Sequence, residues 1–139
     1  YDSQKDHYFI TQKTPALLLT NLLTQLELSH LPVQIIGYSQ GGYLAPFLGL
    51  ELESQGQTVK KIIAISAVMK HAYLPSKLPF PIDQIHGSQD SIVSHDKAKA
   101  SHEHLMRQGN QGDFFSVEGE QHRLRGDLIN RAVQRLRTP

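Results

Sequence analysis

The segment 35–42, with the sequence Ile-Ile-Gly-Tyr-Ser-Gln-Gly-Gly, constrains the fold of this chain more than any other. A short apolar run leads into a Gly-x-Ser-x-Gly pattern, and a segment with a helical pattern follows. This order is typical of a nucleophile elbow, a tight strand-to-helix turn that lifts a serine hydroxyl clear of a sheet. The serine of such a turn has strained backbone angles, and we expect the turn to require glycine at Gly37 and Gly41. Ser39 is therefore the candidate nucleophile of an acyl-transfer reaction.

Size and composition exclude several classes of protein. The chain has 139 residues and a net charge of +1, which is the length of one domain without the charge excess that favours nucleic acid. The absence of cysteine excludes disulfides, thiolate zinc sites and a cysteine nucleophile, and it fits a reducing compartment. No apolar run approaches the roughly 18 residues of a membrane span, and no signal peptide is recognisable. We therefore expect a cytoplasmic protein.

Helical and strand patterns alternate along the chain. The expected helices cover residues 14–28, 43–53, 94–108 and 124–136, and residues 1–13 are expected to be irregular. The expected strands cover residues 33–36, 61–66, 82–86 and 113–117. This alternation predicts an α/β fold in which a parallel sheet carries helices on both faces.

Two further residues match what an activated serine needs. A serine hydroxyl is a poor nucleophile unless a base takes its proton, and the base works best when a third group orients it. Reactive groups of an open parallel sheet gather at the carboxyl ends of the strands. Asp90 follows the third expected strand and His122 follows the fourth, which gives the order Ser, Asp, His expected for this elbow. Asp90 as a plain turn residue and His122 as a surface loop histidine remain the alternatives.

Other clusters of charged and metal-binding residue types have simpler explanations. His95, His102 and His104 share one expected helix, but 102 and 104 point in different directions, and 95 and 102 are about 10 Å apart along the axis. We therefore expect no metal site. His86, at a strand end, is expected to be structural. The last helix is rich in arginine, and we expect these side chains to form a solvated face: Arg123, Arg125, Arg131, Arg135 and Arg137.

Three motifs resemble those of a known family: GYSQGG at 37–42, HGSQD at 86–90 and GEQH at 119–122. Together they look like the α/β-hydrolase superfamily, most similar to the small carboxylesterase/acyl-protein thioesterase (phospholipase/carboxylesterase) group. The resemblance implies a catalytic triad of Ser39 as nucleophile, Asp90 as acid and His122 as base. It also implies that the backbone N–H of Gln40 contributes to the oxyanion hole and that no cofactor is required.

The same resemblance bears on the domain organisation. A complete member of the family has several strands before the elbow, and the loop after an early strand supplies a second oxyanion N–H. We expect residues 1–139 to form a single domain, the C-terminal portion of an α/β-hydrolase fold, with the early strands absent from this sequence. The strand at 33–36 then forms an unpaired apolar edge. These residues alone are expected to self-associate and to be nearly inactive unless an upstream segment completes them.

These patterns predict a serine hydrolase that acts on carboxylic esters or thioesters of small molecules. The connection 69–81 is too short to hold a lid, so we expect an open site, with Tyr38, Tyr73 and Leu74 in contact with the substrate. Two alternatives stay open. One is a hydrolase-like module without catalytic activity that binds a partner or ligand. The other is a peptidase or lactone hydrolase that uses the same triad.

Overall fold

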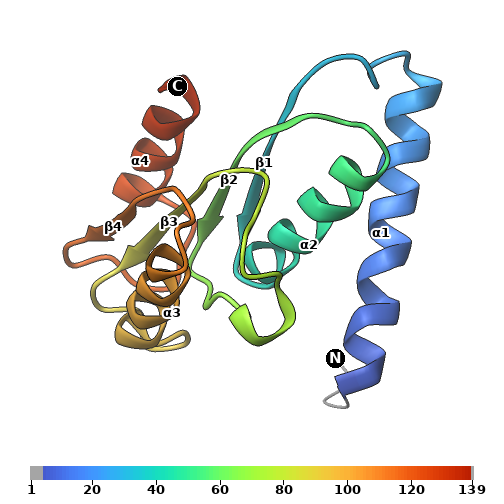
Figure 1. Ribbon diagram of the computed structural model, residues 1–139. Coiled ribbons are helices and arrows are strands. Elements are labelled where there is room, and N and C mark those ends of the chain that lie inside the picture. The colour runs from blue at the N-terminus through green and yellow to red at the C-terminus, as the bar shows by residue number, and fades with distance from the viewer. Residues whose placement is uncertain (1–4, 139) are drawn as a thin grey trace.

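Four parallel strands form a single sheet in the computed structural model, which describes residues 5–138, with side chains from residue 14 onward (Figure 1). The strands are β1 (Val33–Tyr38), β2 (Val59–Ile65), β3 (Ile82–Gly87) and β4 (Phe114–Val117). They lie side by side in chain order, and each neighbouring pair is parallel. All four carboxyl ends therefore meet at one edge of the sheet.

Helices cover both faces of this sheet, as the sequence predicts. They are α1 (Lys5–Gln25), α2 (Gln40–Ser54), α3 (His95–Arg107) and α4 (Gly126–Arg137), with one 3₁₀ turn at His71–Tyr73. α2 and α3 pack on one face and α4 packs on the other, whereas α1 lies against the outer side of α2 (Figure 1). No helix in the described part of the chain has the length and apolar character needed to cross a membrane.

The apolar run of β2 explains why both faces must be covered. Ile62 and Ala64 point into the core beneath α2, and Ile63 and Ile65 point into the core beneath α4. All four side chains are at most 1% exposed. Burying an isoleucine contributes about 1.5–3 kcal/mol, so a strand that is apolar on both faces gains this stabilisation only between two layers.

The start of α1 differs from the prediction. We expect an irregular segment up to residue 13 and a helix opened by Thr14 and Pro15, but the helix begins at Lys5 and runs through Pro15. A proline inside a helix costs about 3 kcal/mol because it removes one hydrogen bond and clashes with the preceding turn. The part of α1 that follows the proline is held against the core, because Ala16 is buried and Leu19 and Leu23 pack there. Residues 1–4 lie outside the described residues.

One arginine of α4 departs from the expected solvated face. Arg135 donates from Nε to Oδ2 of Asp83 at 2.8 Å, and Lys61 Nζ lies 3.6 Å from the same oxygen. Asp83 and Lys61 are both buried, and Oδ1 of Asp83 accepts the backbone N–H of Asp113. Removing one partner of a buried ion pair costs about 3–5 kcal/mol, so these contacts tie α4 to the sheet.

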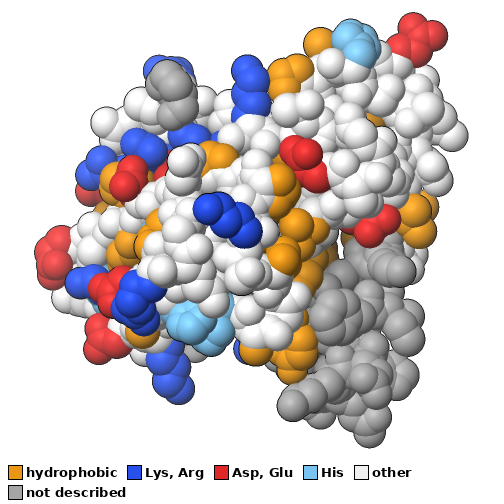
Figure 2. Space-filling view, in the orientation of Figure 1, with side chains coloured by type: hydrophobic (Ala, Val, Ile, Leu, Met, Phe, Trp, Pro, Cys, Tyr) orange, Lys and Arg blue, Asp and Glu red, His pale blue; other side chains and the backbone are white. Residues whose placement is uncertain are grey.

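β1 lies at the edge of the sheet and pairs only with β2 among the described strands. Its Gln34 side chain reaches the Leu136 carbonyl of α4, so Ile36, two residues later, lies on the α4 side of the sheet. Ile36 is nevertheless 45% exposed, and Ile129 and Val133 of α4 are exposed as well. Apolar side chains also reach the surface on the face shown in Figure 2. An apolar, unpaired strand edge of this kind promotes association.

We predict that a protein of residues 1–139 self-associates at micromolar concentration and that Ile36→Lys increases its monomer fraction. A lysine at an exposed edge position places a charge where a second chain would pair. Sedimentation velocity measures the distribution of species. Ile92→Lys is the matched control, because Ile92 is an isoleucine that is 73% exposed on the loop after β3, away from the β1 edge. A parent protein that sediments as a monomer would contradict this prediction.

Candidate active site

Ser39 occupies the tight turn between β1 and α2. Its backbone angles are φ 52° and ψ −116°, a conformation that residues other than glycine rarely adopt. The N–H of Ser39 donates to the carbonyl of Ile65 at 2.9 Å, which ties the turn to the end of β2. The side chain therefore projects from the carboxyl edge of the sheet, as an elbow requires.

The glycines of the elbow are not equivalent. A Cβ on Gly37 would lie closer than 3.0 Å to the Gly41 carbonyl oxygen, and a Cβ on Gly42 would lie 2.7 Å from the Ala67 side chain. Gly37 thus lets the helix start close to the strand, and Gly42 lets α2 approach β2. The expectation that Gly41 is also required is wrong, because a Cβ there would meet no described atom within 4 Å.

Asp90 uses its two carboxylate oxygens for two different purposes. Oδ1 accepts the backbone N–H groups of Ile92 and Val93 at 2.9 and 2.8 Å, which closes the turn after β3. Oδ2 lies 2.8 Å from Nδ1 of His122. The turn role and the contact with His122, which the sequence presents as alternatives for Asp90, are thus combined in one side chain. Burial raises the pKa of Asp90, but the hydrogen bonds from Val93, His122 and Ile92 outweigh it and hold the pKa below its usual value.

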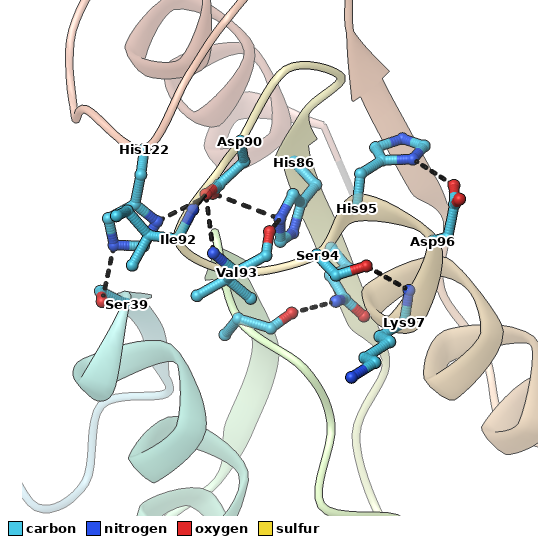
Figure 3. A network of polar contacts seen from close by, with 12 residues as sticks. Ser39, His86, Asp90, Ile92, Val93, Ser94, His95, Asp96, Lys97 and His122 are labelled. Atoms are coloured by element: carbon cyan, nitrogen blue, oxygen red, sulfur yellow. Dashed lines mark hydrogen bonds and ion pairs between the residues drawn. The ribbon is translucent and has the colours of Figure 1, made fainter.

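His122 connects the other two residues (Figure 3). Its Nδ1 faces Asp90, and its Nε2 lies 2.9 Å from Oγ of Ser39. The three side chains come from the elbow, the loop after β3 and the loop after β4. The structure therefore brings together the three residues that the sequence analysis selects, over separations of 32 and 83 positions in the chain.

Two residues that the sequence analysis passes over hold the two loops together. A Cβ on Gly87 would lie closer than 3.0 Å to the backbone of Glu120, so only glycine lets the loop before His122 lie against the end of β3. The Ser88 hydroxyl accepts the N–H of Gly119 at 2.9 Å, and the N–H of Gln89 donates to the Glu120 carbonyl. The signal in the sequence is the Gly-Ser pair inside the HGSQD motif.

The expected substrate-contact residues have different surroundings. The Tyr38 ring lies 5.3 Å from the imidazole of His122, and burial, with the charge of Asp90, raises the pKa of its hydroxyl. Leu74 is buried in the core beneath α2, and Tyr73 packs against the same core, so the structure does not bring them to the three polar residues. Contact between the substrate and Tyr38, Tyr73 or Leu74 stays a prediction.

A cavity of about 610 Å³ lies beside Asp90. It is lined by Ser88 and residues 90–97, together with Tyr43, Val68 and Lys70. The connection after β2 holds only the short 3₁₀ turn at His71–Tyr73. The open site that the length of this connection predicts stays a prediction.

The histidines of α3 have separate surroundings. Nε2 of His95 lies 2.8 Å from Oγ of Ser116, His102 is buried 5.8 Å from the Phe114 ring, and the His104 ring stacks on His71. Among the residues that the structure describes, no three histidine or carboxylate side chains could together hold a metal ion. These histidines therefore serve as packing and surface residues of α3.

The sequence profile of the phospholipase/carboxylesterase family matches residues 9–138. The chain belongs to the phospholipase/carboxylesterase family. This confirms the family that the three motifs resemble, and with it the α/β-hydrolase class of fold. A curated relative, acyl-protein thioesterase 1 homolog 1 of Dictyostelium discoideum, is 30% identical over 119 residues. That match covers 76% of this chain and 49% of the relative, so this family member spans about half the length of that protein.

Solved structures show the same fold. Esterase PE8 superimposes with a TM-score of 0.75 at 24% identity, over 91% of this chain and 59% of its own. A protein described as a CIB-like hydrolase, from Thermoplasma acidophilum, gives a TM-score of 0.71 at 20% identity, with the same two coverages. A single-substitution variant of SOBER1 from Arabidopsis thaliana gives 0.66 at 19% identity, over 96% of this chain and 67% of its own.

We predict that Gly37→Ala destabilises this family member and that Gly41→Ala does not. The added methyl group at position 37 overlaps a backbone carbonyl that cannot move without shifting the start of α2, and overpacking of this kind costs about 1–3 kcal/mol. At position 41 the space is open, and alanine is the better helix former by about 1 kcal/mol. Urea denaturation followed by circular dichroism measures both. Equal losses of stability would show that the elbow is not built around Gly37.

Proposed function

We propose that this chain is a serine hydrolase that cleaves carboxylic esters or thioesters through Ser39, His122 and Asp90. The observation that carries the proposal is the position of His122, whose two ring nitrogens lie 2.9 Å from Ser39 Oγ and 2.8 Å from Asp90 Oδ2. An activated serine requires a hydroxyl in contact with an imidazole that in turn contacts a carboxylate, and these three side chains meet that geometric requirement.

The reaction follows from these contacts. His122 carries its proton on Nδ1, where the Asp90 carboxylate accepts it, so the lone pair of Nε2 is free to take the Ser39 hydroxyl proton as Oγ attacks the carbonyl carbon. The protonated imidazole then gives that proton to the departing alcohol or thiol. Water enters, His122 takes its proton, and hydrolysis of the acyl-serine releases the acid and restores the serine. Throughout the reaction Asp90 keeps the proton of the neutral His122 ring on Nδ1 and stabilises the positive charge of the protonated ring.

The negative charge on the substrate oxygen needs hydrogen-bond donors. Gln40 is the first residue of α2, and N–H groups in the first turn of a helix have no carbonyl partner within that helix. We assign the Gln40 N–H to the oxyanion hole, as the family resemblance implies. An enzyme whose oxyanion hole lacks one donor turns over roughly 10²–10³-fold more slowly. We therefore expect slow turnover unless a second N–H is supplied from outside the described residues.

The substrate class rests on the chemistry of the triad and on the family. A related protein bears the name acyl-protein thioesterase, which supports an ester or thioester as the bond that is cleaved. The steps above use only side chains, backbone N–H groups and water. Tyr38, next to His122, is the proposed contact to the substrate. A cytoplasmic location remains a prediction from the composition.

We predict that a fluorophosphonate probe labels this chain at Ser39. The reagent phosphonylates only activated serines, and it reports activation even where turnover is slow. Mass spectrometry of the labelled peptide identifies the site. Ser39→Ala should abolish labelling, whereas Ser91→Ala, which removes an exposed serine hydroxyl beside Asp90, should leave it unchanged.

Two outcomes would contradict the proposal. A folded chain that takes no label would favour the alternative of a hydrolase-like binding module. Label on a serine other than Ser39 would assign the activated nucleophile elsewhere. Once Ser39 is labelled, a panel of ester, thioester, lactone and peptide substrates decides among the reactions that the same triad supports.

A further inference from the structure

His86 lies directly behind the proposed triad. It is 0% exposed at the end of β3, and its Nε2 lies 2.9 Å from the Val93 carbonyl oxygen and 3.3 Å from Oδ2 of Asp90 (Figure 3). Oδ2 is also the oxygen that faces His122. The imidazole of His86 therefore contacts Oδ2 of Asp90, whereas Oδ1 of Asp90 closes the turn.

These contacts fix which nitrogen carries the proton. Two oxygen atoms face Nε2, so a lone pair there would be repelled by both, whereas an N–H can donate to both. Nδ1 of His86 is buried and has no hydrogen-bond partner among the described residues. A proton on Nδ1 would thus be a buried donor without an acceptor, which is destabilising. The neutral ring with its proton on Nε2 is the form that fits.

We propose that His86 is a positioning residue whose Nε2–H, hydrogen-bonded to the Val93 carbonyl, also attracts Oδ2 of Asp90 at 3.3 Å and so holds the carboxylate in line with His122. This inference rests on the proposed function, because its purpose is to orient the triad. Oδ1 of Asp90 is held by Ile92 and Val93, but those contacts alone leave Oδ2 to be placed by His122. His86 supplies a donor that is rigid, because the same N–H is anchored on the Val93 carbonyl of the same loop.

The charges around His86 favour this neutral state. Burial lowers the pKa of His86, and His95 and His122 lower it further, while the Val93 carbonyl and Asp90 act in the opposite direction without reversing the shift. The remaining ring neighbour is Phe114, which carries no charge. Burial therefore favours the neutral form of His86, which does not compete with a protonated His122 for the charge of Asp90.

The test compares three substitutions in the full chain by the rate of fluorophosphonate labelling at Ser39. His86→Leu removes the donor, and the rate should fall by about 10–100-fold, by analogy with the loss of the partner that orients a metal-ligating histidine. His86→Gln places an amide N–H near the position of Nε2 and should recover most of the rate. His102→Leu is the control. It removes another buried histidine, which lies on α3 away from the triad, and this variant should label at the parent rate.

The pH profile separates positioning from a loss of folded protein. In His86→Leu the low-pH limb of the labelling rate should move to lower pH, because a loosely held Asp90 stabilises the protonated His122 less. A loss of folded protein alone scales the whole profile and leaves the limb in place. An unmoved limb, or equal rates in the leucine and glutamine variants, would overturn the proposal.

Nitrogen-15 NMR of the histidine rings tests the same idea without activity. In the parent, His86 should show a protonated Nε2 and a bare Nδ1 at neutral pH, and the His122 Nδ1–H should give a sharp downfield signal. That signal should persist in His86→Gln and broaden in His86→Leu. A parent that takes no label but shows these spectra contradicts the proposed function alone. A proton on Nδ1 of the neutral His86 ring contradicts the positioning role whether or not Ser39 is labelled.

Discussion

The common direction of the four strands is the constraint on which the rest of this molecule depends. Because every strand ends at the same edge, the residues that follow β1, β3 and β4 meet there, although they are far apart in the chain. The strand ends are also bonded to one another: the N–H groups of Ser39, Ser66 and Ser88 each donate to the end of the next strand. The carboxyl edge is therefore a rigid frame on which the loops are mounted.

Two close backbone contacts convert this frame into a site. Gly37 lets α2 begin against β1, which sets the direction of the Ser39 side chain, and Gly87 lets the loop that carries His122 lie against the end of β3. Asp90 then joins the loops, because one carboxylate oxygen closes its own turn and the other faces His122. His86 completes the arrangement from behind. The geometry of the site is thus determined by sterically required glycines as well as by its polar residues.

The elements and the three polar residues could be predicted from the sequence because each leaves a local signal. The apolar run of β2 is a short-range pattern, and so is the start of the helix expected at 94–108, where Ser94 caps α3 and its Oγ accepts the Lys97 N–H. Asp90 and His122 could be found because parallel strands make chain order predict spatial position. The link from Asp83 to Arg135 has no such signal, since its residues are 52 positions apart and their pairing depends on how α4 lies on the sheet. The beginning of α1 could not be predicted, because Thr14-Pro15 is a local pattern of a helix start, whereas here the proline lies inside the helix.

The central claim is that Asp90 and His122 act on Ser39 as one unit, and a double-mutant cycle tests it most directly. Fluorophosphonate labelling rates at Ser39 would be measured in the parent, in His122→Ala, in Asp90→Ala and in the double variant, with folding checked by circular dichroism. Groups that act as a unit are strongly non-additive. If Asp90 and His122 act as one unit, the double variant labels no more than a few-fold more slowly than His122→Ala. Losses that multiply in the double variant would contradict it, because Asp90 would then contribute independently of the histidine that it contacts.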